Sequence, residues 1–295
     1  MKSLLNHLPR VTFALLILAL LVLPAASQNT TTRMVIAAST VMFWWSWASA
    51  VHLLGQRAAL RFVAIACAIG WTAEQLGASY GWFFGDYHYT DVLGPTLGDV
   101  PAVIPLMWFV LCYAAYVIAN FIVWQTPSDG ATPVRQSLVM ALMAAMLVTA
   151  YDLGADPYMV FVLKAWIMVK TDGWWFGETL QGFVGWALVS FAIVFSFRLT
   201  LRGQRGVVAP AVAPRHLLAP LVIYGGNMLF QVVLGHPVET RTVALFAMGI
   251  PLLAALCGWS RWQARQRIAA PEAEARQAAA RQAAAREAAV SREAA

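Results

Sequence analysis

Long apolar runs separated by short polar connections dominate the pattern of the chain. A helix needs about 20 predominantly apolar residues to cross a bilayer, and several of the runs reach that length. They cover residues 11–27, 34–54, 59–79, 101–124, 137–153, 182–200, 216–234 and 243–260. Within each run the apolar residues are continuous rather than alternating, which disfavours a transmembrane β-barrel. The pattern therefore predicts an all-α fold, a polytopic membrane helix bundle with about eight transmembrane helices.

Three segments do not fit this simple count. Residues 1–33 read either as a first transmembrane helix or as a signal-like segment, because positive charges precede the apolar run and small residues follow it. Residues 157–170 are apolar but too short to span, so we expect a re-entrant or interfacial helix there. Residues 264–295 lack a large apolar face, and we expect an Ala/Arg/Glu-rich solvated tail, partly helical or disordered. The membrane catalytic bundle is then expected at residues 34–263.

The composition excludes an ordinary soluble domain and fixes the expected orientation. Hydrophobic residues make up 60% of the chain and charged residues 12%. The net charge of +6 needs no nucleic-acid partner, because Lys and Arg gather in alternate loops and in the tail, as they do on the cytoplasmic side of membrane proteins. This distribution predicts a multi-pass protein of the plasma membrane with both termini in the cytoplasm.

Metal and cofactor motifs are absent from the sequence. Cys67, Cys112 and Cys257 are far apart in apolar surroundings, and His88 has no second histidine at ligand spacing. There is no phosphate-binding loop, no dinucleotide fingerprint and no serine nucleophile elbow. We therefore expect neither a metal nor a cofactor.

Two short blocks of similar sequence stand out against the apolar background. The first is Gly81-Trp-Phe-Phe-Gly-Asp86, and the second is Gly173-Trp-Trp-Phe-Gly-Glu178. The predicted topology places both blocks, and nearly all carboxylates outside the tail, toward the non-cytoplasmic face. Carboxyl groups near lipid cost several kcal/mol unless they are satisfied, so they mark functional sites by default. The two blocks are therefore expected to share one pocket.

Three carboxyl groups in or near the apolar runs are candidate catalytic groups. Glu74 lies late in its run, where a carboxyl group can keep its proton and act as a general acid; the alternative is a buried Glu that only hydrogen-bonds a neighbouring helix. Asp152 and Asp156 are spaced to share one helix face. Gly154 and Pro157 nevertheless make an unbroken helix unexpected, and Asp156 followed by Pro is also typical of an N-cap. Asp152 has no such structural explanation.

The fourth catalytic candidate, Asp86, lies in an aromatic loop that could fold over a pocket as a lid, or could simply belong to an interfacial aromatic belt. Loop carboxylates such as Glu178 are usually solvated and are therefore weaker candidates for catalysis. The candidate substrate-binding residues are Trp82, Phe84, Tyr87, Tyr89, Trp108, Tyr151, Trp175, Phe176 and Trp186. Carboxyl groups can protonate a double bond and direct a water, while ring faces stabilise a carbocation. This set suits an apolar alkene taken from the lipid.

Several motifs resemble one known family. They are Glu74-x-x-Gly77, Phe84-Gly-x-Tyr87-x-Tyr-Thr90, Val100-Pro-x-x-Ile-Pro-Leu-x-Trp108, Asp152-Leu-x-x-Asp156-Pro-x-Met159, Trp175-Phe-Gly177 and Phe183-x-Gly-Trp186. As a set, over roughly residues 60–200, they are similar to the membrane carotenoid 1,2-hydratases, which include γ-carotene 1′-hydratases and bisanhydrobacterioruberin hydratases. The resemblance implies cofactor-free hydration of the terminal C1–C2 double bond of an acyclic (ψ) carotenoid end group to a tertiary alcohol. The substrate would be γ-carotene or a lycopene-like carotenoid from the bilayer, and other carotenoid biosynthesis enzymes are candidate partners.

The sequence departs from that family pattern at Ala78-Ser79-Tyr80 and at Glu178, which leaves the substrate subclass open. Three other functions also stay open. A carotene cyclase would use the same acid–cation chemistry without capturing water. A membrane prenyltransferase is suggested by Asp152-x-x-x-Asp156, which is half of an Asp-rich magnesium–diphosphate signature. A carotenoid-binding subunit would have no catalysis at all.

Overall fold

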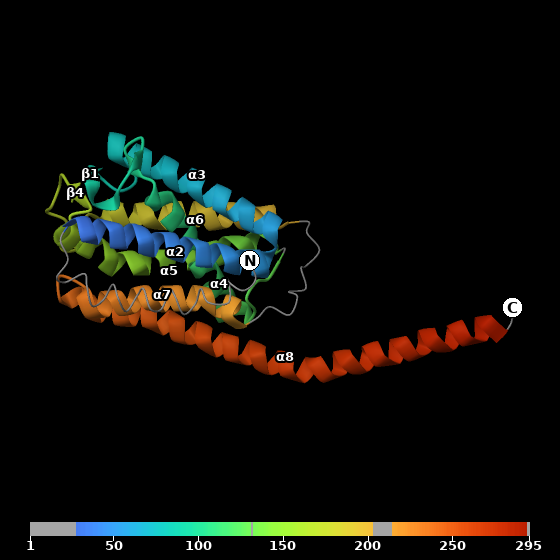
Figure 1. The fold of residues 1–295 in the computed structure, drawn as a ribbon. Helices are drawn as coiled ribbons and strands as arrows, with labels where there is room; N and C mark the ends of the chain where they lie inside the picture. Colours follow the sequence, from blue (N-terminus) through green and yellow to red (C-terminus); the bar gives the residue numbers. More distant parts are fainter. Residues whose placement is uncertain (1–27, 131, 203–213, 294–295) are drawn as a thin grey trace.

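The computed structural model describes residues 28–130, 132–202 and 214–293. Within these ranges, seven helices are long and apolar enough to cross a membrane. They are α2 (Gln28–Leu54), α3 (Gln56–Tyr80), α4 (Val103–Trp124), α5 (Val134–Tyr158), α6 (Leu180–Thr200), α7 (Pro214–Leu234) and α8 (Glu239–Glu293). They form one bundle, and the distal part of α8 extends away from it (Figure 1). The all-α membrane bundle is confirmed, while the predicted span at 11–27 lies outside the described residues.

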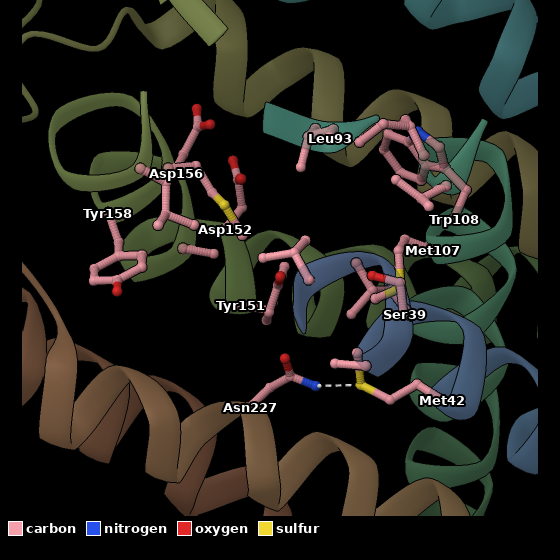
Figure 2. Close-up of a pocket in the computed structure, with 18 of the residues that line it drawn as sticks. Ser39, Met42, Leu93, Met107, Trp108, Tyr151, Asp152, Asp156, Tyr158 and Asn227 are labelled. Atoms are coloured by element: carbon pink, nitrogen blue, oxygen red, sulfur yellow. Dashed lines mark hydrogen bonds between the residues drawn. The ribbon is translucent and has the colours of Figure 1, made fainter. Parts of the chain in front are cut away.

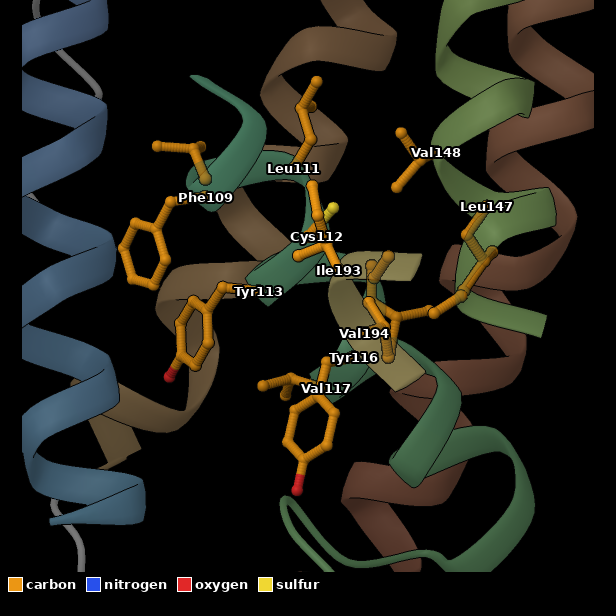
Figure 3. Packing of buried hydrophobic residues seen from close by; sticks show 14 of the residues in the cluster. Phe109, Leu111, Cys112, Tyr113, Tyr116, Val117, Leu147, Val148, Ile193 and Val194 are labelled. Carbon is orange, nitrogen blue, oxygen red and sulfur yellow. The ribbon is translucent and has the colours of Figure 1, made fainter. Parts of the chain in front are cut away.

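Helix α4 is the centre of the bundle. It is apolar on all sides, as expected of a helix with no solvated face, and it contacts each of the other six helices. Phe109, Tyr113 and Val117 on α4 belong to the same buried cluster as Ile193 of α6 and Val148 of α5 (Figure 3). Because lipid is as apolar as these side chains, close packing rather than hydrophobic burial holds such helices together.

Helix α3 packs against its neighbours through a stripe of small buried residues, which includes Ala66, Gly70 and Ala73. Small residues at this spacing let helices approach closely. A Cβ atom at Gly70 would lie 2.6 Å from Cδ1 of Trp108. The missing side chain at Gly70 therefore makes room for the Trp108 ring against α3, one turn before Glu74.

Short strands lie at one end of the bundle. Strand β1 (Tyr87–Tyr89) pairs antiparallel with β4 (Trp166–Met168), and β2 (Thr96–Leu97) pairs with β3 (Val100–Pro101). A 3₁₀ turn, η2 (Asp91–Leu93), follows β1. The β1–β4 pair brings the connection after α3 against the connection after α5 (Figure 1). The expectation that the two similar blocks lie at the same end of the bundle is thus confirmed.

Two expectations about the end of α5 are wrong: a separate helix at residues 157–170 and an N-cap at Asp156. Residues 157–170 form no separate helix, because α5 continues to Tyr158 and is followed by a π-helical turn, η3 (Met159–Leu163), and by β4. Asp156 is not an N-cap, because it lies inside α5 together with Pro157. A proline inside a helix leaves the carbonyl four residues earlier without its usual donor. Here that carbonyl belongs to Leu153, and the indole N–H of Trp175 donates to it at 2.9 Å.

The opposite end of the bundle is closed by a buried ion pair. The guanidinium of Arg198, on α6, bonds the Asp129 carboxylate in the connection between α4 and α5, and it also donates to Thr132 at 3.2 Å. Beyond the bundle, α8 continues as one helix to Glu293, so the tail is helical over most of residues 264–295. The domain boundary at 263/264 remains a prediction.

Candidate active site

A cavity of about 220 Å³ lies among helices α2 to α7 and is closed on one side by β1 and β4. Among the described residues, three carboxyl groups line it, those of Glu74, Asp152 and Asp156, and no Lys, Arg or His side chain does. Figure 2 shows the two aspartates side by side on α5, with Trp108 of α4 on the other side of the space. Most of the remaining lining is apolar, so the cavity combines carboxyl groups with a hydrophobic surface.

Glu74 is held by three hydrogen-bond donors. The phenol of Tyr87 donates to Oε2 at 2.5 Å, the phenol of Tyr89 donates to the same oxygen at 2.7 Å, and the Trp108 indole donates to Oε1 at 3.0 Å. Both tyrosines reach Glu74 because side chains alternate along a strand, so Tyr87 and Tyr89 share one face of β1 while His88 between them is exposed. Glu74 is therefore arranged as an acceptor at both oxygens.

The two phenols keep their protons. Burial raises the pKa of Tyr87 and of Tyr89 well above the ordinary value, and the neighbouring Glu74 charge adds to the effect. A phenol in this state is a donor toward Glu74 at any physiological pH. The hydrogen bonds at 2.5 and 2.7 Å fall in the range of O–H donors to an ionised acceptor.

Asp152 and Asp156 lie one turn apart on α5, both line the cavity, and their carboxyl groups point the same way (Figure 2). They share a face because the helix passes through Pro157 unbroken. Asp152 is 1% exposed, and neither of its carboxyl oxygens has a hydrogen-bond partner. Asp156 differs, because the Trp166 indole and the carboxyl group of Glu178 lie within hydrogen-bonding reach of it.

Glu178 was given little weight from the sequence, yet it is buried beside the site with an exposed fraction of 3%. The segment 173–178 folds back on itself through the bridges Gly173–Gly177 and Trp175–Glu178. A Cβ atom at Gly173 would lie 1.9 Å from the carbonyl oxygen of Glu178, so only glycine fits this turn. Burial, and then the nearby Asp156 charge, raises the pKa of Glu178 far above its usual range, so it is protonated at neutral pH.

Aromatic rings surround the carboxyl groups. The ring centroids of Trp108 and Trp186 are 4.6 Å apart, and Phe84 lies 6.3 Å from Trp108 and 6.4 Å from Trp186. The ring of Tyr151 lies 6.4 Å from that of Trp186. All four rings line the cavity. Such a wall is apolar but presents electron-rich faces to a cation.

Most of the candidates named from the sequence meet at this cavity, and four do not. Glu74, Asp152 and Asp156 line it with the aromatic residues Phe84, Tyr87, Tyr89, Trp108, Tyr151 and Trp186. Asp86 is exposed and does not line the cavity, and the Trp82 ring is 57% exposed. Trp175 and Phe176 also lie outside the lining; Trp175 instead bonds the Leu153 carbonyl.

Sequence reasoning missed the polar groups that α7 contributes. Asn227 and Gln231 line the cavity, and Gln231 donates to the Tyr151 carbonyl at 2.9 Å while its Oε1 atom has no partner. One turn apart inside an apolar run, these two amides are the signal that could have marked α7. Among the described residues, no group of three or more His, Cys, Asp or Glu side chains could hold a metal ion.

Comparison with known proteins identifies the family of the chain. The sequence profile described as "Carotenoid biosynthesis protein" matches residues 29–256. The chain belongs to this carotenoid biosynthesis protein family. Bisanhydrobacterioruberin hydratase of Haloarcula japonica is similar to it, with 32% identity over 146 residues, which are 49% of this chain and 46% of that protein. The alignment thus spans about half of each protein. No solved structure matches the chain significantly.

Proposed function

We propose that this member of the carotenoid biosynthesis protein family adds water to the terminal C1–C2 double bond of an acyclic carotenoid end group. The main support for the proposal is the set of three carboxyl groups in a ring-lined cavity to which the described part of the chain contributes no cationic side chain. The similarity to a bisanhydrobacterioruberin hydratase supports the same reaction type. The family indicates a role in carotenoid biosynthesis, and the proposal specifies which reaction the protein catalyses.

The reaction needs only an acid, a cation-tolerant cavity and a water. A carboxylic acid gives its proton to C2 while the C1–C2 π bond breaks, and the positive charge forms at C1, the more substituted carbon. The oxygen of a water then bonds to C1, and one water proton leaves to a carboxylate. The product is a tertiary alcohol, and no proton, electron or cofactor is consumed overall. General acid catalysis of this kind contributes about 10²–10⁴-fold in rate.

The cavity suits one end of a long hydrocarbon chain. Its volume of about 220 Å³ is below the roughly 300–1,000 Å³ of pockets that enclose drug-sized ligands, so only an end group would fit inside. The rings of Trp108 and Trp186 would face the C1 cation, where cation–π attraction is worth about 2 kcal/mol for a cation removed from bulk water. Asn227 and Gln231 also line the cavity and are polar groups that could orient the attacking water.

The absence of cationic side chains from the lining bears on the competing functions. A prenyltransferase binds a diphosphate, which needs Lys or Arg groups beside the magnesium carboxylates, and none of the described Lys or Arg residues lines this cavity. A cyclase would use the same acid and the same rings, so the fate of the cation separates it from a hydratase.

Expression in cells that make lycopene or γ-carotene, followed by mass analysis of the pigments, tests the proposal. A gain of one water, with the oxygen derived from ¹⁸O-labelled water and one deuterium at C2 in D₂O, is the expected result. Unchanged mass with altered absorption would show a cyclase, an added prenyl unit a prenyltransferase, and no change in any carotene background a non-catalytic role. Asp152→Asn and Glu74→Gln should each abolish the product while the protein still inserts into membranes.

A further inference from the structure

The carboxyl groups of the site differ sharply in how many donors each receives. Glu74 accepts from Tyr87, Tyr89 and Trp108. Asp156 lies within hydrogen-bonding reach of Glu178 and of the Trp166 indole. Asp152, which is buried and lines the same cavity, receives no hydrogen bond at either oxygen. Hydrogen bonds from donors favour the charged form of a carboxyl group, so these groups are unequal in their ability to carry charge.

Among these carboxyl groups, we therefore expect the protonated ones to be those that accept no hydrogen bond. Four carboxyl groups in a small buried region cannot all be ionised, because like charges repel and no cationic side chain in the described ranges lines the cavity. Glu178 is protonated and can donate to Asp156. Asp152 faces the charges of Asp156 and Glu74 and has nothing to compensate a charge of its own.

We propose that Asp152 is the proton donor to the alkene, that Glu74 and Asp156 stay ionised beside it, and that Glu178 is a positioning residue which keeps Asp156 charged. This assignment rests on the proposed hydratase function. In the reaction, the proton of Asp152 forms the new C2–H bond, and Glu74 stabilises the C1 cation electrostatically. The proton that the captured water releases returns to the Asp152 carboxylate, so the site is reset within one turnover.

Binding of a cation analogue tests the assignment without turnover. The probes are a truncated polyene that ends in a protonated dimethylamino group and the isosteric neutral hydrocarbon, and the readout is quenching of tryptophan fluorescence. The wild-type protein should prefer the ammonium probe. Glu74→Gln should lower that preference about tenfold or more, the size expected for a close buried charge pair. Asp152→Asn should retain the preference although it abolishes hydration, because it removes no charge.

The matched control for these variants is Asp172→Asn, which removes an exposed carboxylate at the same end of the bundle. It should change neither the preference nor the rate. A preference that survives in Glu74→Gln and disappears in Asp152→Asn would overturn the assignment. If the wild-type protein hydrates no carotene, the proposed function fails, whereas the binding pattern still decides which carboxyl group is charged.

Two further measurements address the proton donor and Glu178. Formic acid should restore hydration to Asp152→Ala, increasingly as the pH falls, because undissociated acid replaces the missing donor; rescue that rises with formate anion would contradict the role. Glu178→Gln keeps a donor toward Asp156 and should retain most of the activity, whereas Glu178→Met should lower kcat about tenfold with little change in KM. Equal losses in both Glu178 variants, with intact folding, would refute the positioning role.

Discussion

The two phenols that hold Glu74 provide a direct test of how charge is arranged in the cavity. Tyr87→Phe and Tyr89→Phe each remove one hydroxyl group and leave the ring that lines the cavity. Each change deletes one donor to the same oxygen of Glu74, at 2.5 Å for Tyr87 and 2.7 Å for Tyr89. In the proposed mechanism, Glu74 should then stabilise the C1 cation less well.

The expected size follows from the strength of such bonds. A hydrogen bond to a charged group is worth about 1.5–3 kcal/mol, and each 1.4 kcal/mol is a factor of ten. Each single variant should therefore lower kcat about 10- to 150-fold. KM should change little, because the neutral substrate does not depend on the charge of Glu74. Because both phenols bond one oxygen, the double variant should lose less than the product of the two single effects.

The assay is hydration of a defined carotene by purified protein in proteoliposomes, with the alcohol quantified by chromatography. Thermal unfolding of each variant shows whether the fold is intact. Tyr80→Phe is the matched control, since Tyr80 is 69% exposed and its hydroxyl group lies outside the cavity. Wild-type kcat in both Tyr87→Phe and Tyr89→Phe would refute the view that Glu74 acts as a donor-stabilised carboxylate.

Three further changes test other parts of the structure. Gly70→Ala should push the Trp108 ring away from Glu74, lowering both activity and stability by about 1–3 kcal/mol, measured as kcat and Tm. Asp129→Asn should leave Arg198 buried without its partner and lower the unfolding free energy by about 3–5 kcal/mol, seen as a lower Tm with normal pigment chemistry in the protein that folds. Glu178→Gln should reduce the decrease in stability that occurs as the pH rises, measured as Tm between pH 5 and pH 9.

The sign of the Glu178 effect follows from its raised pKa. In the unfolded chain Glu178 ionises near its usual value of 4.5, whereas in the folded protein it keeps its proton. The folded state thus binds one more proton above that pH, and stability falls by about 1.4 kcal/mol for each further pH unit until the folded group ionises. Gln cannot ionise and removes this contribution. Parallel pH curves for the two proteins would contradict the burial of a protonated Glu178.

Controls for the other two changes are available in the same chain. Gly249→Ala should be tolerated, because its Cβ atom would lie 3.4 Å from the Met228 sulfur, an ordinary contact. An unchanged Tm in Asp129→Asn would mean that the ion pair with Arg198 contributes nothing. Normal activity in Gly70→Ala would mean that the Trp108 indole is not needed by Glu74.

Much of the bundle could be predicted from the sequence because membrane helices leave a strong local signal. Each apolar run within the described residues became a helix, and the charges of the loops placed the two similar blocks at one end. Glu74 and Asp152 could be found because a carboxyl group inside an apolar run is costly and therefore conspicuous. Their hydrogen-bond partners could not, since β1 pairs with a strand that lies far away in the sequence.

The errors arose where local chemistry was completed by distant residues. Pro157 is typical of a helix start, but the indole of Trp175 supplies the donor that lets the helix continue. The similarity of the two blocks also misled the prediction of where their acidic residues lie. Each has a glycine with positive φ before its acid, Gly85 at 88° and Gly177 at 93°. The acid after the first, Asp86, nevertheless turns to solvent, and the acid after the second, Glu178, is buried. Only the tertiary fold decides between those outcomes.

The bond from Trp175 to the Leu153 carbonyl has a consequence for engineering this protein. The last turn of α5 carries Asp156. At this turn the Leu153 carbonyl accepts its hydrogen bond from the loop residue Trp175 instead of from a backbone N–H of the helix. We therefore expect that changes to residues 171–179, none of which lines the cavity, can shift the position of Asp156 relative to Asp152. A library confined to cavity-lining positions would leave that control untouched, whereas one that varies the loop around Trp175 could retune the acid pair while the substrate-facing surface stays the same.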